Sequence, residues 1–227
     1  MTTRKDFLVA GTLAAAAIPA TALADAPAQK LDFDLAAFTK LLNGPQAHKH
    51  LFASIEINGG EVFSAMRNTL NAYKDIGIAW SEVFPVAVLY HGVSILMAFD
   101  DTIWNRYVIP YSEQLRPNHG GYNQIMSIHK AGSAGNPVLV KQSGAWDTSI
   151  PSLVADAGAY FFVCDNAAHG MAKAIGAALN KQPDAVYGDL SQHLVANAQL
   201  VPAGVWAVHA IQEQRFTLLQ TSLYPNA

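Results

Sequence analysis

Short apolar runs alternate along the chain with longer segments in which apolar residues recur at helical spacing. The run "VFPVAVLYHG" (83–92) is almost continuously apolar, as in a strand buried on both faces of a sheet. In "EVFSAMRNTLNAYKDIG" (61–77), apolar residues stand at 62, 63, 66, 70 and 73, which predicts a helix ending at Gly77. The same pattern predicts strands at 50–57, 159–164, 199–202 and 215–220, and helices at 34–42, 93–107, 151–158, 166–180, 188–198 and 203–214. This alternation is typical of an α/β domain with a largely parallel sheet and helices on both faces.

Residues 107–150 interrupt this alternation. They contain Pro110, Pro117, Pro137 and several glycines, and they show little periodicity outside "YNQIMSIHKA". A segment of this length between two regular elements is usually functional, as a lid or an interface, or else mobile. We therefore expect residues 25–227 to form one domain that carries an inserted loop or lid region at about 107–150.

The first 24 residues have the organisation of an export signal. "MTTRKDF" is a short basic stretch, and "FLVAGTLAAAAI" is an apolar run too short to span a bilayer well. "PATALA" ends in the small-x-small pattern of a cleavage site, and "TRKDFL" resembles a twin-arginine signal with Lys5 in place of the second arginine. We expect residues 1–24 to be removed near Ala24, leaving a periplasmic or otherwise exported chain with no membrane span. The alternative is an N-terminal helix of the domain.

Composition narrows the classes of function. The formal net charge is −3 and no long basic run is present, so the chain lacks the electrostatic footprint of nucleic-acid binding. Cys164 is the single cysteine, whereas exported proteins usually pair an even number of cysteines in disulfides. An internal disulfide is therefore impossible, and the thiol is either buried and inert or accessible and reactive.

Polar residues follow three of the predicted strands, at the edge where α/β sheets bind ligands. These residues are Asn58, His91, Gly92, Cys164, Asp165 and Asn166. Cys164 ends a strand and directly precedes a helix, whose N-terminus favours a thiolate, whereas the charge of Asp165 disfavours it. His91 is a candidate acid or base. His169 follows Asp165 by four residues on the helix, so it is a candidate neighbour of the thiol.

Each candidate also has a structural interpretation. Cys164 can be a small buried hydrophobic residue, and His91 can be a histidine at the edge of the core. Asp165 or Asn166 can serve as the helix N-cap. The sequence contains no Gly-x-Ser-x-Gly motif and no phosphate-binding glycine-rich loop with a lysine, so several enzyme classes are not indicated.

A soft metal ion such as copper is the one cofactor that these residues suggest. Cys164, His91 and His169 would provide suitable ligands, and Met171 would add a thioether. The four residues do not follow a standard ligand spacing, so no metal is assigned to them.

Four stretches of the chain resemble segments of one known family. "HKHLFASIEINGGEVFSAMRNTLNAYKDI" and "VAVLYHG" resemble its first strand and helix and its second strand with a His-Gly end. "LVADAGAYFFVCDNAAHG" resembles the segment that carries the family cysteine, and "LVPAGVWAVHAIQEQRFTLLQ" resembles the closing segment. The family is the DsrE/DsrF-like sulfur-relay family, and the four stretches cover most of residues 48–106 and 150–220.

The resemblance implies a flavodoxin-like open sheet of about five mostly parallel strands and a homo-oligomer, often a trimer or hexamer. In members that transfer sulfur, the cysteine carries it as a persulfide, and that role maps onto Cys164. Those members are mainly cytoplasmic and have a shorter connection than residues 107–150, so this chain departs from the family twice. We expect an extracytoplasmic DsrE-like sulfur carrier, or a thiol-dependent protein of sulfur metabolism, rather than a classical enzyme. Its partner would be a sulfur donor or acceptor protein or a small sulfur compound.

Outside the cytoplasm a lone exposed thiol is open to over-oxidation. We therefore expect Cys164 to be partly shielded, with residues of 107–150 packed over it. Two other functions remain open. One is a metal- or cofactor-binding periplasmic protein that uses Cys164 with His91 or His169, and the other is a non-catalytic ligand-binding oligomer in which Cys164 belongs to the core.

Overall fold

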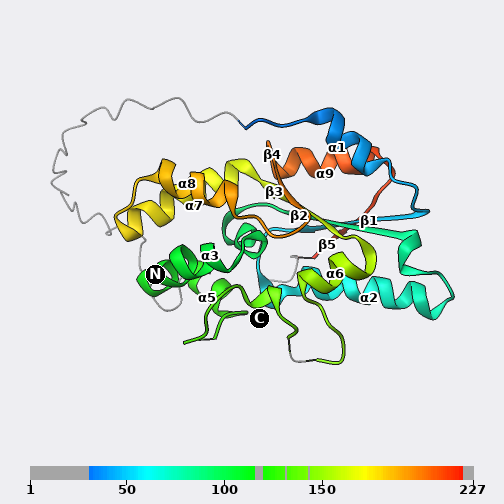
Figure 1. Cartoon of the computed structure of the whole chain (residues 1–227), viewed down its shortest axis with the longest axis horizontal. Coiled ribbons are helices and arrows are strands. Elements are labelled where there is room, and N and C mark those ends of the chain that lie inside the picture. The colour runs from blue at the N-terminus through cyan, green and yellow to red at the C-terminus, as the bar shows by residue number, and fades with distance from the viewer. Residues whose placement is uncertain (1–30, 116–119, 131, 143, 222–227) are drawn as a thin grey trace, which may run out of the picture. The chain divides into compact units, whose positions relative to one another are not determined.

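Within residues 31–115, 120–130, 132–142 and 144–221, which the computed structural model describes, five parallel strands form one sheet (Figure 1). Their spatial order is β4-β3-β2-β1-β5. Their bounds are β1 (His48–Ser54), β2 (Val83–Leu89), β3 (Tyr160–Cys164), β4 (Ala198–Val201) and β5 (Thr217–Gln220). Each pair of neighbouring strands in the sheet is parallel, which confirms the predicted α/β fold with a flavodoxin-like open sheet.

The sequence of β2 fits its place inside the sheet. All of its residues are buried, as the continuous apolar run predicts for a strand covered on both faces. Pro85 has no backbone N–H to donate, and it pairs with His50 of β1. β3 pairs with β2 only from Val86 onward, so the proline lies where β2 has a single neighbouring strand.

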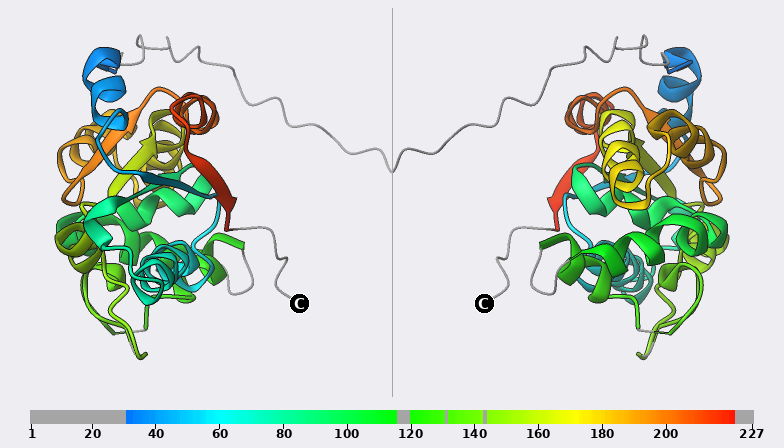
Figure 2. Two further views of the ribbon diagram at one scale, coloured as in Figure 1. Left: turned by 90° about the vertical axis from the view of Figure 1, so that its right-hand side faces the viewer. Right: turned by 90° about the vertical axis from the view of Figure 1, so that its left-hand side faces the viewer.

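Two hydrophobic clusters cover the two faces of the sheet. One cluster lies under the helices α1 (Leu35–Leu42) and α9 (Gly204–Glu213). The larger cluster lies under the helices α2 (Glu61–Asp75), α6 (Ile150–Ala157), α7 (Asp165–Leu179) and α8 (Pro183–Gln192). Figure 2 shows α1 and α9 on one side of the strands and α2 on the other. The prediction of helices on both faces is confirmed.

The path of the chain explains this division of the helices. From β1 to β4 each strand adds on the same side of the previous one, so right-handed crossovers place the connecting helices on one face. The connection from β4 to β5 returns to the far side of β1, and its helix α9 covers the opposite face. The connections that leave β3 and β4 therefore diverge. The ends of these two strands form the topological switch point, where open α/β sheets bind ligands.

The prediction of a single helix at 93–107 is wrong. A 3₁₀ helix, η3 (Gly92–Ala98), comes first, and Phe99 then has an extended backbone. The Asp100 carboxylate accepts hydrogen bonds from the N–H groups of Thr102 and Ile103, so it caps a new helical run. That run consists of α3 (Asp101–Ile103), the π-helical η4 (Trp104–Val108) and α4 (Ile109–Gln114).

The predicted helix at 188–198 is displaced along the chain. α8 begins at Pro183, where a proline costs no hydrogen bond in the first turn, and it ends at Gln192. The remaining described elements are α5 (Gly120–Met126), η1 (Asn58–Gly60), η2 (Trp80–Glu82) and η5 (Pro137–Leu139).

The described residues from Leu31 onward belong to one compact unit. The predicted export signal at 1–24 lies outside the described residues. Within the described ranges, no helix combines the length and the apolar character that crossing a membrane requires.

Candidate functional site

Cys164 lies at the junction of β3 and α7. It is the last residue of β3, it pairs with Val201 of β4, and it is the N-cap of α7. The side chain is a free thiol, and 8% of the residue surface is exposed. The cysteine is therefore found where the sequence predicts it, at the carboxyl end of a buried strand, and it is shielded from solvent.

Gly204, the first residue of α9, lies against this junction. A Cβ atom added to Gly204 would lie 2.0 Å from the Cβ of Tyr90 and 3.2 Å from the Cβ of Cys164. Two carbon atoms that are not bonded to each other cannot lie 2.0 Å apart, so residue 204 must be a glycine for α9 to approach Tyr90 this closely. As a result, the end of β2, the end of β3 and the start of α9 meet around the thiol.

Two helices on opposite faces of the sheet begin beside Cys164. α7 starts at the next residue, and α9 starts at Gly204. The N-terminus of a helix carries a partial positive charge and unpaired N–H groups, which stabilise an anion placed near it. Both helix starts lie at the switch point of the sheet, a position that is suited to binding an anion.

Asp165 is held away from open solvent by two aromatic partners. The hydroxyl of Tyr187 donates a hydrogen bond of 2.6 Å to Asp165 Oδ1, and His169 Nε2 lies 3.6 Å from Oδ2. The rings of His169 and Tyr187 stack with centroids 3.7 Å apart. Burial, followed by the Asp165 carboxylate, raises the pKa of Tyr187 well above its ordinary value, so the hydroxyl stays protonated and donates.

These contacts change the interpretation of Asp165. The N-cap of α7 is Cys164, whose side chain makes no capping hydrogen bond, and Asp165 is the first helical residue. The prediction of an N-cap at Asp165 or Asn166 is therefore wrong, because the Asp165 carboxylate takes a tertiary partner on α8 instead. The hydrogen bond from Tyr187 holds the Asp165 carboxylate toward α8. Asn166 is exposed.

His91 follows β2, as predicted, and its side chain is exposed. Its backbone has a φ of 85° and a ψ of 128°, an uncommon conformation for a residue with a side chain. Its carbonyl oxygen accepts hydrogen bonds from the N–H and the hydroxyl of Ser94. The preceding residue, Tyr90, is the one that packs on Gly204 beside the thiol. A role for His91 as acid or base stays a prediction.

Tyr90 is a site residue that the sequence analysis did not single out. Its ring lies against Gly204, and its hydroxyl donates a long hydrogen bond of 3.4 Å to Gln220 Oε1 at the end of β5. The sequence does indicate that Tyr90 lies at the end of a buried strand, because it ends the apolar run before His91. Its contact with a glycine more than one hundred residues away could not be read from that run.

No contact of Asn58 or Gly92 with Cys164 is found among the described residues. Asn58 has a φ of 40°, its side chain bonds to Glu61, and its N–H donates to Gln124 Oε1. Gly92 is exposed at the start of η3, with a φ of 49°. These contacts connect Asn58 to α2 and α5, and a binding role for either residue stays a prediction.

A metal site is not formed by the residues that suggested one. In the part of the chain that the structure describes, no three residues among His, Cys, Asp and Glu lie close enough together to hold a metal ion. His169 faces Asp165 across four residues, as the helical spacing predicts. Met171 is buried in the larger hydrophobic cluster, where it packs as a core residue.

The described part of 107–150 lies on the same face of the sheet as α7. Its residues Tyr107, Ile125 and Val138 belong to the larger hydrophobic cluster, together with Ala168 of α7. A lid over Cys164 formed by residues 107–150 would have to lie on this face of the sheet, beside α7. The close contacts of Cys164 that are known come from Gly204 and β4, so the packing of residues 107–150 over the thiol stays a prediction.

The matches of this chain to known proteins are structural. No family model matches it, and no curated protein matches it. A solved structure of a protein of unknown function from Methanobacterium thermoautotrophicum is similar, with 13% identity and a TM-score of 0.34. That match covers 76% of this chain and 98% of the other.

Proposed function

We propose that the protein is an extracytoplasmic sulfur carrier that holds sulfur as a persulfide on Cys164, in the manner of DsrE-like proteins. The observation that supports this is the place of the thiol. Cys164 is a free cysteine at the switch point of the sheet, beside the N-termini of α7 and α9. That field stabilises the two anions of the cycle, the thiolate and the persulfide.

The chemical step is a sulfur exchange without an external oxidant. The Cys164 thiolate attacks the outer sulfur of a small polysulfide or persulfide. A new sulfur–sulfur bond forms as the bond in the donor breaks, and the electron pair leaves with the shortened donor as its thiolate. Attack by an acceptor thiolate on the outer sulfur of the Cys164 persulfide reverses the step and regenerates the thiolate.

The burial of Cys164 favours a small donor. With 8% of the residue surface exposed, the thiol offers little area to a globular partner, whereas an inorganic polysulfide needs only a small exposed area. The same shielding limits contact with larger oxidants, which suits a lone thiol outside the cytoplasm. A small sulfur compound is therefore the donor that we propose.

The test is mass spectrometry of the intact protein after incubation with polysulfide. We expect a gain of about 32 Da per sulfur atom at Cys164, removable by dithiothreitol, whereas a sulfinic acid of the same nominal mass is not removed. The Cys164→Ser variant should gain nothing. An unmodified wild-type protein, or an equal gain in the variant, would contradict the proposal. Copper or iron bound to the native protein through Cys164 would contradict it in favour of a metal site.

A homo-oligomer is part of the same proposal. β5 is an edge strand whose Leu218 and Leu219 are 41% and 49% exposed, and such an apolar edge is suited to pairing with a second copy. Sedimentation velocity should show an assembly larger than a monomer, and Leu219→Lys should shift it toward monomer. A wild-type protein that sediments as a monomer at all concentrations would contradict this part.

A further inference from the structure

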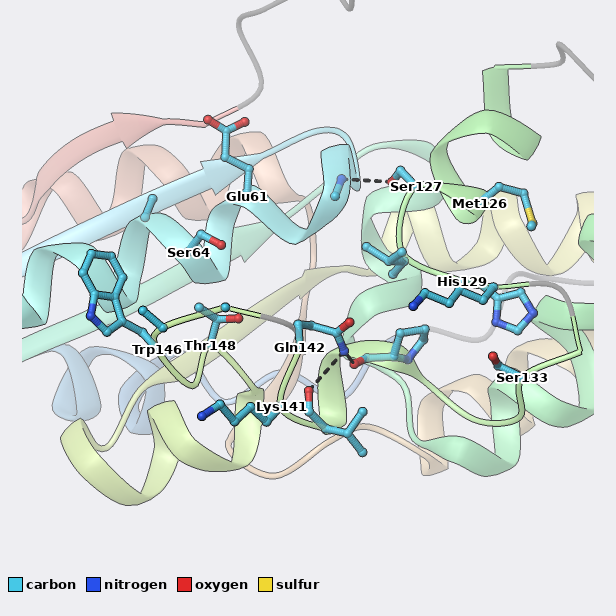
Figure 3. Close-up of a pocket in the computed structure, with 18 of the residues that line it drawn as sticks. Glu61, Ser64, Met126, Ser127, His129, Ser133, Lys141, Gln142, Trp146 and Thr148 are labelled. Atoms are coloured by element: carbon cyan, nitrogen blue, oxygen red, sulfur yellow. Dashed lines mark hydrogen bonds between the residues drawn. The ribbon is translucent and has the colours of Figure 1, made fainter.

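A cavity of about 1020 Å³ lies between the start of α2 and residues 126–148 (Figure 3). In Figure 3, Ser64 projects from α2 on one side, and Lys141 and Trp146 follow the loop on the other. Cys164 does not line this cavity. The volume is in the range of sites that enclose small organic ligands.

Polar contacts hold the two walls of the cavity together. Gln124 Oε1 accepts hydrogen bonds from the N–H groups of Ile57 and Asn58, at 2.8 and 2.9 Å. Ser127 Oγ accepts a hydrogen bond of 2.9 Å from the N–H of Gly59. These bonds join α5 and the residue that follows it to the loop that begins α2. The cavity is therefore a built feature of the fold, with its walls in place before a ligand arrives.

The charge of the lining is positive. Lys130 and Lys141 both line the cavity, and within the described ranges neither forms an ion pair with an acidic residue. Glu61 is the acidic residue among those that line it, and its carboxylate accepts a hydrogen bond from the Asn58 side chain. An anion entering the cavity would meet two ammonium groups without an ion-pair partner, although Lys141 also lies within electrostatic reach of Asp147.

Large apolar side chains stand beside these lysines. Trp146 is 52% exposed and Val140 is 61% exposed, and both line the cavity. An exposed indole provides a flat apolar surface on which an aromatic ring can stack. Exposed apolar groups next to unpaired cations indicate a ligand that has both an apolar body and an anionic group.

His129 gives an independent sign of an unfilled site. It lines the same cavity, 4% of its surface is exposed, and its Nδ1 atom has no hydrogen-bond partner among the described residues. Buried polar atoms in native proteins are nearly always paired, so an unpaired one calls for an explanation. This wall of the cavity therefore contains a buried polar atom without a hydrogen-bond partner among the described residues.

We propose that this cavity binds a small organic anion with a planar aromatic body, which stacks on Trp146 while its anionic group pairs with Lys130 and Lys141. The inference goes beyond the sulfur-carrier function and does not require Cys164. It places a second binding site on the same face of the sheet as α7, built from the inserted segment.

The test uses anilinonaphthalenesulfonate, an aromatic sulfonate that fluoresces when bound, and its uncharged counterpart phenylnaphthylamine. We expect saturable binding of the anionic dye to the full-length protein. The double variant Lys130→Met, Lys141→Met should weaken the anionic dye about three- to tenfold and leave the neutral amine unchanged. Trp146→Leu should weaken both dyes about three- to tenfold.

Matched variants separate this inference from its alternatives. Lys173→Met removes an exposed lysine of α7 that does not line the cavity, and it should leave binding unchanged. Cys164→Ser should also bind normally, so failure of the sulfur-carrier function would not remove the signal. The proposal is overturned if wild-type protein shows no saturable binding of the anionic dye. It is also overturned if the neutral amine binds as tightly, or if Lys173→Met weakens binding as much as the double variant.

Discussion

The thiol site and the cavity are built in opposite ways. Around Cys164, the ends of regular strands and the starts of two helices meet so closely that Gly204 has no room for a side chain. Around the cavity, a helix start and an irregular segment leave Trp146 and Val140 largely exposed. In the first region, the residues that surround the thiol also hold the strands and helices together. In the second, binding residues can change with little effect on the fold.

The comparison predicts its largest effect at Gly204. Gly204→Ala forces a Cβ atom to 2.0 Å from the Cβ of Tyr90, so β2, β3 or α9 must move. We expect the free energy of unfolding to fall by about 2 kcal/mol or more. Urea unfolding followed by circular dichroism measures this change.

Gly170→Ala is the matched control for Gly204→Ala. Gly170 lies inside α7, and a Cβ atom there meets nothing within 4 Å. This substitution should be neutral or stabilise the protein by up to about 1 kcal/mol, because alanine favours a helix more than glycine does. Equal losses at the two glycines would contradict the close packing around the thiol.

Tyr187→Phe should have the next largest effect. It removes the hydroxyl that donates to the buried Asp165, so we expect a loss of about 1–3 kcal/mol in the free energy of unfolding. The Asp165 carboxylate then loses the partner that holds it toward α8, so the rate of sulfur loading at the neighbouring Cys164 should change as well. The control is Tyr160→Phe, since no hydrogen bond of the Tyr160 hydroxyl is found within the described residues. If Tyr187→Phe changes neither the stability nor the rate of sulfur loading, then the Tyr187–Asp165 hydrogen bond has no influence on the thiol.

The cavity should contribute a pH dependence through His129. Burial lowers the pKa of His129 below its ordinary value near 6.5, so the unfolded chain binds more protons as the pH falls below 6.5. The stabilising effect of the neutral imidazole is fully present above the unfolded pKa and is lost as the pH falls from that value to the lower folded-state pKa. His129→Gln should reduce the slope of unfolding free energy against pH just below pH 6.5, by at most about 1.4 kcal/mol per pH unit. His50, whose pKa is also lowered by burial, remains in both proteins, so an unchanged slope would exclude His129 as a contributor.

The smallest effect on stability is expected at Trp146. Because its side chain is largely exposed, Trp146→Leu should change the free energy of unfolding by less than about 0.5 kcal/mol while it weakens dye binding. The same unfolding and binding measurements check both parts. A loss of stability comparable with that of Tyr187→Phe would mean that the cavity wall is part of the core.

Local patterns in the sequence were enough to predict individual elements of the fold. The continuous apolar run of β2 predicted a strand buried on both faces, and the chain from Tyr160 into α7 predicted a cysteine between a strand and a helix. The four-residue spacing predicted that His169 would face Asp165. Each of these features depends on residues that are close together in the chain.

Contacts between distant segments could not be predicted in this way. Tyr187 of α8 donates a hydrogen bond to Asp165 of α7. Gly204, at the start of α9, packs against Tyr90, which follows β2 and lies more than one hundred residues earlier in the chain. The break in the predicted helix at 93–107 also coincides with a contact to a distant residue, because the side-chain amide of Asn136 donates hydrogen bonds to the carbonyls of Met97 and Phe99. The cavity is lined by the start of α2 and by the segment after α5. The sequence of one segment does not indicate that it lies beside the other.

The central claim is that Cys164 is a working thiol and not a packed core residue. The most direct measurement compares the rate of polysulfide loading at Cys164 in the folded protein with its rate in urea-unfolded protein. If the site acts as proposed, the folded protein should load at least as fast as the unfolded chain, because the starts of α7 and α9 favour the thiolate. The claim would be contradicted if the folded protein loads only at the rate set by its unfolding equilibrium.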